Sequence, residues 1–330
     1  MRVVIAPDKF KGTLTAQEAA DAMASAVRER WAGAETVVLP MADGGDGTLD
    51  ALGGPTRHDT VTGPLGLPVA AAWRLDGDSA VIESAAASGL VLAGGARGND
   101  PWGATSRGVG ELLALALDAG ATRIVVGMGG SAMTDGGRGA LDALGARVPF
   151  PPGVIVLTDA TAAFGDAARV FGPQKGADPA MVERLTARLQ TDAAEWTARF
   201  GRSLDGVART GAAGGLSGAL FAAGAELVDG AAFVAAARGL DAAIAGADLV
   251  LTGEGAFDAT TLEGKGPGHV LALAAGHGVP SALIAGNVAP GVGGPHVFSM
   301  TRTVGADLAW RDPVVALRAA TAEALSRLDY

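Results

Sequence analysis

Lysine is rare in this chain of 330 residues, and every lysine lies in a glycine-rich segment. The lysines are Lys9, Lys11, Lys175 and Lys265. Lys9 and Lys11 follow Asp8 in the stretch APDKFKG, directly after a short apolar run at residues 3–6. Lysine ammonium groups neutralise phosphate or carboxylate oxygens, and glycine lets backbone amides approach an anion closely. The pattern predicts an anion site where the first strand ends.

Carboxylates occur in the same kind of segment. The stretch MADGGDGT holds Asp43 and Asp46, MGGSAMTDGG holds Asp135, and TGEGAFDATTLEGKG holds Glu254 and Asp258. Carboxylates bind divalent cations or accept a hydroxyl proton, and phosphoryl transfer depends on such groups together with lysines and glycine-rich loops. Taken singly, some of these polar residues have a structural alternative. These are Asp8, Asp46 and Thr48 as caps of turns or helices, and Lys9 as a solvated loop charge.

Apolar runs alternate with helical patterns, which indicates an α/β fold with a mainly parallel sheet. A capping box from Thr15 to Glu18 predicts a helix after the first strand. Further strands are expected at residues 35–40, 122–127, 247–255 and 280–286. In open parallel sheets, ligands bind beyond the carboxyl ends of the strands, and the glycine-rich segments fall at these ends.

The middle of the chain has a different pattern. Short alternating runs separated by Gly, Asp and Pro at residues 62–84 predict hairpin strands and a mixed sheet. A long amphipathic helix is expected after Asp178. The predicted architecture is a Rossmann-like, doubly wound parallel-sheet domain at residues 1–56 and 236–330. A second α/β domain containing a mixed sheet is predicted as an insertion at residues 57–235.

Composition excludes several classes of protein. The net charge of −10 argues against binding nucleic acid, and the lack of cysteine excludes disulfides and thiolate metal sites. No apolar run approaches the roughly 20 residues that span a bilayer, so no membrane association is expected. We predict a cytoplasmic protein. The sequence leaves open whether it forms a homodimer.

One segment resembles a different kind of site. Residues 127–132, GMGGSA, follow a predicted strand and fit the dinucleotide-binding fingerprint. The loop continues through Asp135 and Gly137 before a helix can start, and no acidic residue stands about 20 residues further on. A nicotinamide-dependent oxidoreductase is therefore the weaker hypothesis, and the histidines fit no metal spacing.

Read in order, the glycine-rich segments resemble the type-1 glycerate kinase family. The blocks APDKFKGTLTA, PMADGGDGT, AVIESAAASGL, GMGGSAMTDGG, FGPQKGA and ADLVLTGEGAFDATTLEGKGP occur in family order and cover most of the chain. The resemblance implies phosphorylation of D-glycerate with ATP and Mg²⁺, with 2-phosphoglycerate expected ahead of 3-phosphoglycerate. It also implies two α/β domains and an active site in the cleft between them.

The chemistry of the segments, read with the resemblance, suggests roles for residues of this sequence but does not assign them uniquely. Catalysis is expected from Lys11, Asp43, Asp135 and Asp159, with Asp43 and Asp135 ahead of Asp159 as general base, and magnesium binding from Glu254 and Asp258. The residues expected to bind glycerate or nucleotide are Asp8, Lys9, Gly44, Gly45, Asp46, Thr48, Gly129, Gly130, Ser131, Thr134, Lys175 and Lys265.

The chain also departs from the family pattern. Thr134 occupies an asparagine position, Asp100-Pro101-Trp102 replaces an Asn-Pro-Leu, and a second Asn-Pro-Leu block near Asp159 is missing. These changes keep two alternatives open: a kinase for a related hydroxy acid, and a non-catalytic sensor of a small phosphorylated acid. For Lys175 the alternative is a solvated turn residue ahead of the helix near Asp178.

Overall fold

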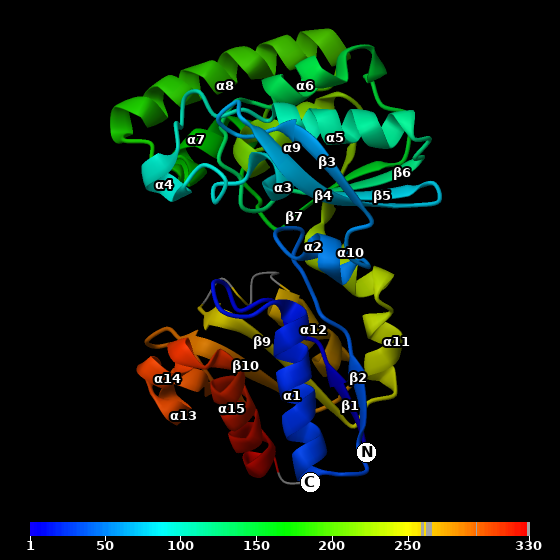
Figure 1. The fold of residues 1–330 in the computed structure, drawn as a ribbon, viewed down its shortest axis with the longest axis vertical. Coiled ribbons are helices and arrows are strands. Elements are labelled where there is room, and N and C mark those ends of the chain that lie inside the picture. The colour runs from blue at the N-terminus through cyan, green and yellow to red at the C-terminus, as the bar shows by residue number, and fades with distance from the viewer. Residues whose placement is uncertain (259–260, 262–265, 295, 329–330) are drawn as a thin grey trace. The chain divides into compact units, whose positions relative to one another are not determined.

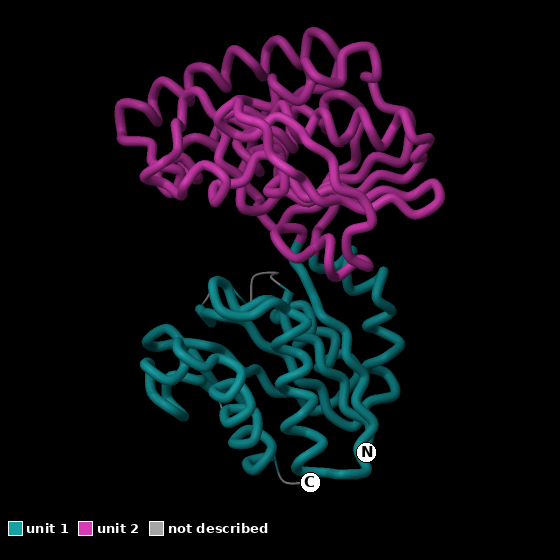
Figure 2. Tube along the Cα trace, in the orientation of Figure 1, with its two compact units in different colours: residues 1–43, 231–330 teal, residues 44–230 magenta. Residues whose placement is uncertain are grey.

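The computed structural model describes residues 1–258, 261, 266–294 and 296–328. The chain forms two compact units, which Figure 2 shows in different colours. Unit 1 contains residues 1–43 and 231–330, and unit 2 contains residues 44–230. Unit 2 is therefore inserted, in sequence, between the two parts of unit 1. The domain boundaries given above, at residues 56 and 236, stay a prediction.

Unit 1 is built on a parallel sheet that joins both ends of the chain. Its strand order is β11-β10-β9-β1-β2, and each of these pairings is parallel. The central strand β9 pairs with β1, with Leu249 opposite Val3. The strands are β1 Arg2–Ile5, β2 Glu35–Val38, β9 Leu249–Phe257, β10 Ser281–Val288 and β11 Val297–Ser299.

Helices cover both faces of this sheet. On one face α1 and α15 lie side by side (Figure 1), and their Met23 and Leu317 pack with Ile5 in one core cluster. On the other face Leu271 of α12 packs against Leu283. Thr15 and Glu18 form the predicted capping box of α1. The helices are α1 Ala16–Arg30, α10 Gly230–Ala237, α11 Leu240–Ala245, α12 Gly266–Gly276, α13 Met300–Val304, α14 Ala306–Arg311 and α15 Pro313–Arg327.

Unit 2 contains the mixed sheet. Its strand order is β3-β4-β5-β6-β7-β8, with antiparallel pairing from β3 to β5 and parallel pairing from β5 to β8. The hairpin pattern at residues 62–84 therefore predicted the sheet type correctly. The strands are β3 Arg57–Thr62, β4 Pro68–Asp76, β5 Ser79–Glu83, β6 Arg123–Gly127, β7 Val154–Thr158 and β8 Glu226–Asp229.

The longest helix of unit 2 among the described residues is α8, which runs along the outside of this unit (Figure 1). It begins after Asp178, as the sequence predicted, and the Asp178 side chain caps it by accepting from the Met181 N–H. The α-helices are α2 Thr48–Ala51, α3 Ser84–Ser88, α4 Gly95–Gly98, α5 Arg107–Asp118, α6 Arg138–Leu144, α7 Ala167–Phe171, α8 Pro179–Phe200 and α9 Leu216–Ala222. The α/β fold class, with one parallel and one mixed sheet, is confirmed. No described helix is long and apolar enough to cross a bilayer.

Candidate functional site

The carboxyl edge of the unit 1 sheet brings three predicted acidic residues together. Beyond β1, the Asp8 N–H donates to the Gly253 carbonyl at 2.8 Å, which places Asp8 beside Glu254 of β9. The Met41 N–H donates to the Pro7 carbonyl at 2.8 Å, so the segment that ends at Asp43 lies on the other side. Parallel pairing thus positions carboxylates from three distant parts of the sequence.

Lys9 bridges two of these carboxylates. Its Nζ lies 3.6 Å from Asp8 Oδ1 and 3.9 Å from Asp43 Oδ1. Asp8 is buried, and its Oδ1 also accepts from the Lys9 N–H at 2.6 Å. Burial raises the pKa of Asp8 to about 7, an effect that Lys9 opposes and that the negative charges of Asp43 and Glu254 increase. A buried carboxyl group with such a pKa can gain or lose a proton near neutral pH.

The donor set at this edge suits a hard cation that brings ligands of its own. Within the described residues, no group of three or more His, Asp or Glu side chains is arranged to hold a metal ion. Mg²⁺ is usually held by one or two carboxylates together with substrate phosphates, so such a group is not required. Asp258 follows β9 directly and is half-buried, with its N–H donating to Thr261 Oγ1 at 3.3 Å. Lys265 lies outside the described residues.

Lys11 occupies a tight turn in unit 1. The Phe10 N–H donates to the Leu14 carbonyl, and the turn between them exposes Lys11 to solvent. A Cβ on Gly255 would lie 3.0 Å from the Lys11 backbone nitrogen, so the turn packs directly on β9 next to Glu254. The Lys11 side chain is therefore free to reach an anion at this edge.

In unit 2, two of the predicted glycine-rich loops lie against each other. The Met128 N–H donates to the Gly44 carbonyl at 2.7 Å, and Thr48 Oγ1 donates to the Gly45 carbonyl at 2.7 Å. A Cβ on Gly130, which has a φ of +65°, would lie 2.4 Å from Asp46 Oδ1. This Oδ1 atom is buried and accepts no hydrogen bond from any described residue. The loops thus bring Gly44, Gly45, Asp46, Thr48, Gly129 and Gly130 to the carboxyl end of β6.

Glu83 is a residue of this edge that the sequence reasoning missed. It ends β5, and its Oε1 accepts from the Leu49 N–H at 2.7 Å at the start of α2. Burial raises the pKa of Glu83 to about 7, and the nearby charges of Asp46 and Asp50 add to the shift. The sequence feature that could have identified Glu83 is its position as an acidic residue directly after the apolar run AVI.

Asp135 and Asp159 occupy contrasting positions. Asp135 is buried, and its carboxylate accepts from the N–H groups of Ser106, Gly137 and Gly139 and from the Ser106 hydroxyl. Its lone pairs are therefore used to hold the backbone. Asp159 follows β7 and is exposed, whereas Thr134 is completely buried.

Lys175 is not a solvated turn residue. It ends a short 3₁₀ helix, Pro173–Lys175, but only 2% of the residue is exposed. Its Nζ donates to Ser131 Oγ at 3.0 Å and to the Met133 carbonyl at 2.6 Å. Burial lowers the pKa of Lys175 to about 7, which the negative charge of Asp135 opposes. The structure thus joins two predicted site residues, Lys175 and Ser131, by a direct hydrogen bond.

The loop after β6 does not form a dinucleotide-binding turn. The helix α6 begins only at Arg138, whereas the fingerprint requires a helix directly after its glycines. This geometry argues against the nicotinamide hypothesis.

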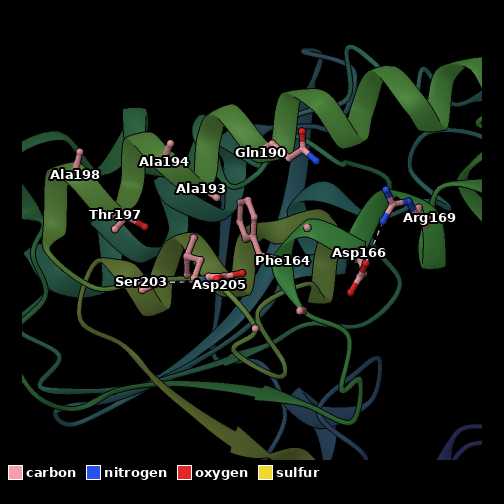
Figure 3. Close-up of a pocket in the computed structure, with 14 residues that line it drawn as sticks. Phe164, Asp166, Arg169, Gln190, Ala193, Ala194, Thr197, Ala198, Ser203 and Asp205 are labelled. Carbon is pink, nitrogen blue, oxygen red and sulfur yellow. Dashed lines mark hydrogen bonds and ion pairs between the residues drawn. The ribbon is translucent and has the colours of Figure 1, made fainter.

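A cavity of about 710 Å³ lies elsewhere in unit 2, between α8 and the segments 163–166 and 203–206 (Figure 3). Its wall includes the buried Phe164, three alanines of α8 and the Asp166–Arg169 ion pair. None of the predicted site residues lines it.

Comparison with known proteins identifies the family. The sequence model of the glycerate kinase family matches residues 3–156 and 152–306. The chain is 40% identical over 350 residues to glycerate 2-kinase of Escherichia coli K12, covering 92% of each chain. It is 38% identical over 328 residues to a Bacillus subtilis glycerate kinase, covering 87% of this chain and 85% of the relative. The crystal structure of the candidate glycerate kinase 2 from Salmonella typhimurium LT2 superposes with a TM-score of 0.81 at 36% identity, covering 99% of this chain and 98% of that chain. The chain belongs to the glycerate kinase family.

Proposed function

We propose that the protein transfers the γ-phosphoryl group of ATP to the 2-hydroxyl of D-glycerate in a Mg²⁺-dependent reaction. The choice of the 2-position follows the name of the Escherichia coli relative. The single observation that carries the chemistry is the Asp8–Lys9–Asp43 cluster, in which a lysine lies between two carboxylates at the carboxyl edge of a parallel sheet.

Asp43 is the best candidate for the general base. Its side chain is 19% exposed and so can be reached by a substrate, whereas the Asp135 oxygens already accept hydrogen bonds. As the 2-oxygen attacks the γ-phosphorus, its proton passes to Asp43, a new O–P bond forms, and the bond from the γ-phosphorus to the bridging oxygen breaks to release ADP. Lys9 and Lys11 would neutralise charge on the reacting oxygens. We therefore propose Asp135 as a positioning residue of the loop.

Glu254 and Asp258 would hold Mg²⁺ together with the nucleotide phosphates. Both supply the oxygen ligands that Mg²⁺ prefers, and a cation here would offset the repulsion between Asp8, Asp43 and Glu254. When bound, Mg²⁺ neutralises charge on the transferred phosphoryl group. In unit 2, the backbone amides of Gly129 and Gly130 would donate to an anionic group of a substrate. The Asp46 Oδ1 atom, which has no hydrogen-bond partner among the described residues, would accept from a substrate hydroxyl group. The placement of the active site between two domains stays a prediction.

The test is to incubate the protein with ATP, Mg²⁺ and D-glycerate and to identify the product by NMR. Formation of 2-phosphoglycerate would support the proposal, and 3-phosphoglycerate would correct the position of transfer. Parallel reactions with tartronate and other hydroxy acids test the related-acid alternative. Binding of phosphoglycerate without any turnover would favour the hypothesis of a non-catalytic sensor. A change in NADH fluorescence on addition of the protein would favour the hypothesis of a nicotinamide-dependent oxidoreductase.

A further inference from the structure

The loop after β6 is held through its carbonyl groups by side chains from distant parts of unit 2. Three successive carbonyls each accept a different donor: Ala132 from Asn99 Nδ2 at 3.0 Å, Met133 from Lys175 Nζ at 2.6 Å, and Thr134 from Arg188 Nη2 at 2.6 Å. The Gly136 carbonyl accepts from Trp196 Nε1 at 3.0 Å. We call Asn99, Lys175, Arg188 and Trp196 the carbonyl clamp.

The clamp residues are themselves fixed. Asn99 Nδ2 also donates to the Lys175 carbonyl at 2.9 Å, which ties the lysine backbone to the loop. The Arg188 guanidinium stacks 4.4 Å from the Trp102 ring centroid and donates to the Trp102 carbonyl at 2.8 Å. The clamp therefore holds one loop conformation from several directions.

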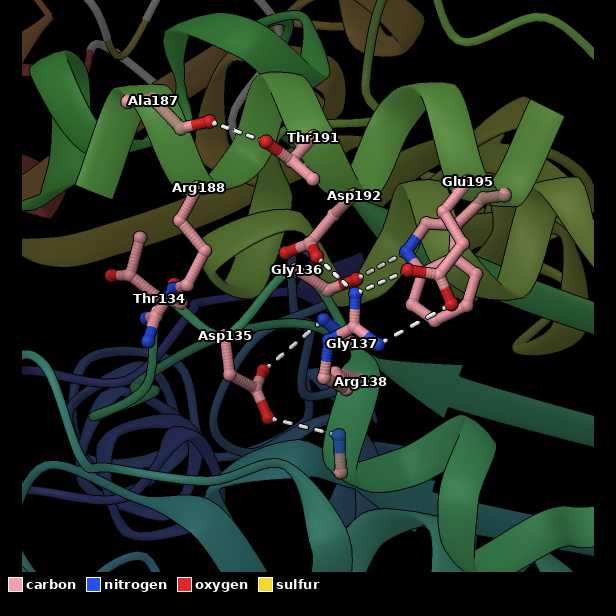
Figure 4. Close-up of polar contacts among 12 residues, drawn as sticks. Thr134, Asp135, Gly136, Gly137, Arg138, Ala187, Arg188, Thr191, Asp192 and Glu195 are labelled. Carbon is pink, nitrogen blue, oxygen red and sulfur yellow. Dashed lines mark hydrogen bonds and ion pairs between the residues drawn. The ribbon is translucent and has the colours of Figure 1, made fainter. Parts of the chain in front are cut away.

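Helix α8 supplies the clamp at the far end of the loop. Figure 4 shows Arg188, Asp192 and Glu195 of α8 lying along the segment from Thr134 to Arg138. A Cβ on Gly136 would lie 2.4 Å from Asp192 Oδ2, so the helix packs directly on the loop backbone.

Lys175 differs from the other clamp residues because it also reaches a hydroxyl group. In its ammonium form Lys175 has no lone pair, so in that form the Ser131 oxygen accepts the hydrogen bond. The Ser131 hydroxyl hydrogen is then directed elsewhere, and no described residue accepts it. Ser131 is 8% exposed and directly follows Gly129 and Gly130, the predicted anion-binding glycines.

A lysine is a costly choice at this position. The Asn99 amide and the Trp196 indole hold other carbonyls of the loop without any charge. Burial of an ammonium group, in contrast, is unfavourable enough to lower the pKa of Lys175 to about 7. A positive charge at a hydrogen-bond donor strengthens the interaction with its acceptor. It also polarises the accepting hydroxyl, which makes Ser131 a better donor in turn.

We propose that Lys175 is a positioning residue, which fixes the Met133 carbonyl and orients the Ser131 hydroxyl so that Ser131 donates to an anionic oxygen of a bound substrate. The anionic oxygen is a phosphate or carboxylate oxygen, and its assignment to ATP or glycerate rests on the proposed function. Lys175 itself does not touch the substrate.

A double-mutant cycle tests whether Lys175 acts through Ser131. Lys175→Met should lower kcat/KM by about 10²-fold, because small misplacements of a binding loop have effects of this size. Ser131→Ala should lower kcat/KM too, and the double variant should be no more than about 3-fold worse than Lys175→Met, because coupled residues are non-additive. Multiplicative losses would overturn the proposal. A larger rise in KM for ATP than for glycerate would assign the anionic oxygen to ATP, and the reverse result would assign it to glycerate.

The matched control is Arg123→Met, which removes one positive charge at the start of β6, the end of the strand away from the Ser131 loop. Arg123 is 71% exposed and pairs only with the exposed Asp78 among the described residues, so its loss should leave kcat/KM unchanged. An equal loss of activity in Arg123→Met would show that net charge, rather than the clamp, controls the rate.

Two further measurements do not depend on activity, and the first of them needs no variant. Treating the wild-type protein with an amine-acetylating reagent should modify the exposed Lys11 quickly and Lys175 slowly, with or without ATP and glycerate. Rapid modification of Lys175 that the substrates prevent would make it a direct contact and overturn the proposal. Where Lys175→Met folds, amide hydrogen exchange in residues 131–137 should increase, and unchanged exchange would contradict the clamp. Absence of glycerate phosphorylation by the wild-type protein would refute the proposed function alone, since these two measurements do not depend on it.

Discussion

The Asp135 carboxylate accepts hydrogen bonds from both the backbone N–H and the hydroxyl of Ser106, each at 2.8 Å. Ser106 immediately precedes α5, and Asp135 lies in the loop before α6, so this pair fixes the loop relative to two helices that pack together. Asp135→Asn places amide hydrogens against backbone donors, and the free energy of unfolding should fall by about 2 kcal/mol.

Urea denaturation measures this loss, with Asp166→Asn as the control. Asp166 is exposed and pairs with Arg169 on the surface, so its substitution should change the free energy of unfolding by less than about 0.5 kcal/mol. An Asp135→Asn protein of wild-type stability but without activity would instead make Asp135 the general base.

Asp8→Asn should stabilise the protein at pH 8. The pKa of Asp8 is raised to about 7 in the folded protein from 3.8, so the folded state holds a proton that the unfolded state loses between these values. Its favourable contribution is complete below pH 4 and is lost as the pH rises through 7. Because asparagine carries no charge, the variant should gain on the order of 3 kcal/mol over wild type at pH 8 and little at pH 4. Thermal unfolding at both pH values checks the sign, and a variant less stable than wild type at pH 8 would show that the carboxylate is well accommodated.

Lys175→Met should show the opposite pH dependence of stability. The pKa of Lys175 is lowered to about 7 from 10.5 in the folded protein, so the unfolded state binds more protons between these values. The cost of burying the charge is complete below pH 7 and disappears as the pH rises toward 10.5. The stability of the variant relative to wild type should therefore be greater at pH 6 than at pH 10, by on the order of 4 kcal/mol. Denaturation at these two pH values tests the difference, and a constant difference would argue that Lys175 is not buried as an ammonium group.

Lys11→Ala should lower kcat by about 10²-fold and leave the melting temperature unchanged. Lys11 is exposed in the turn that packs on Gly255, so its side chain supports no core packing. Loss of one preorganised charge at a reacting phosphate typically costs about 3 kcal/mol in the transition state. Steady-state kinetics and thermal melting of the variant, with Lys11→Arg as the charge-conserving comparison, test the assignment. Wild-type turnover in Lys11→Ala would remove Lys11 from the catalytic residues.

Asp258→Asn should shift the magnesium dependence of the reaction to higher Mg²⁺ concentration. Asp258 follows β9, the strand that contains Glu254, and one or two carboxylates are the usual protein ligands of nucleotide-bound Mg²⁺. The measurement is activity as a function of Mg²⁺ at fixed ATP, with Asp307→Asn on the surface helix α14 as the control. Superimposable curves for wild type and Asp258→Asn would move the metal site to other carboxylates, first Asp43 and Asp46.

Local patterns in the sequence predicted the elements well, because their signals lie within a few residues. The Thr15–Glu18 capping box is formed as predicted, and the long helix α8 begins directly after Asp178 as predicted. The resemblance of the glycine-rich blocks to a family was confirmed by the comparisons. The roles given to individual site residues stay predictions.

Burial could not be predicted, because it depends on partners far away in the sequence. Nothing around Lys175 in FGPQKGA shows that its side chain is enclosed by Ser131 and Met133, more than 40 residues earlier. The near-neutral pKa of Glu83 likewise depends on how the loop at Asp46 folds over the end of β5. Composition and spacing pointed to candidate residues for chemistry, but could not indicate which of them are exposed.

The pairing of β1 with β9 also determines when unit 1 can fold during synthesis on the ribosome. Val3 pairs with Leu249, so the first strand leaves the ribosome long before its central partner exists. At about 5–20 residues per second, this delay is on the order of 10 to 50 s, during which the apolar residues of β1 and α1 have no completed sheet to cover. Residues 44–230 are complete earlier and contain a core cluster of their own, so unit 2 can fold first. The Asp8–Glu254 edge is then among the last features of the molecule to form, and a ribosome that stalls before residue 249 would release a chain with a folded middle and no pairing partner for β1 in β9.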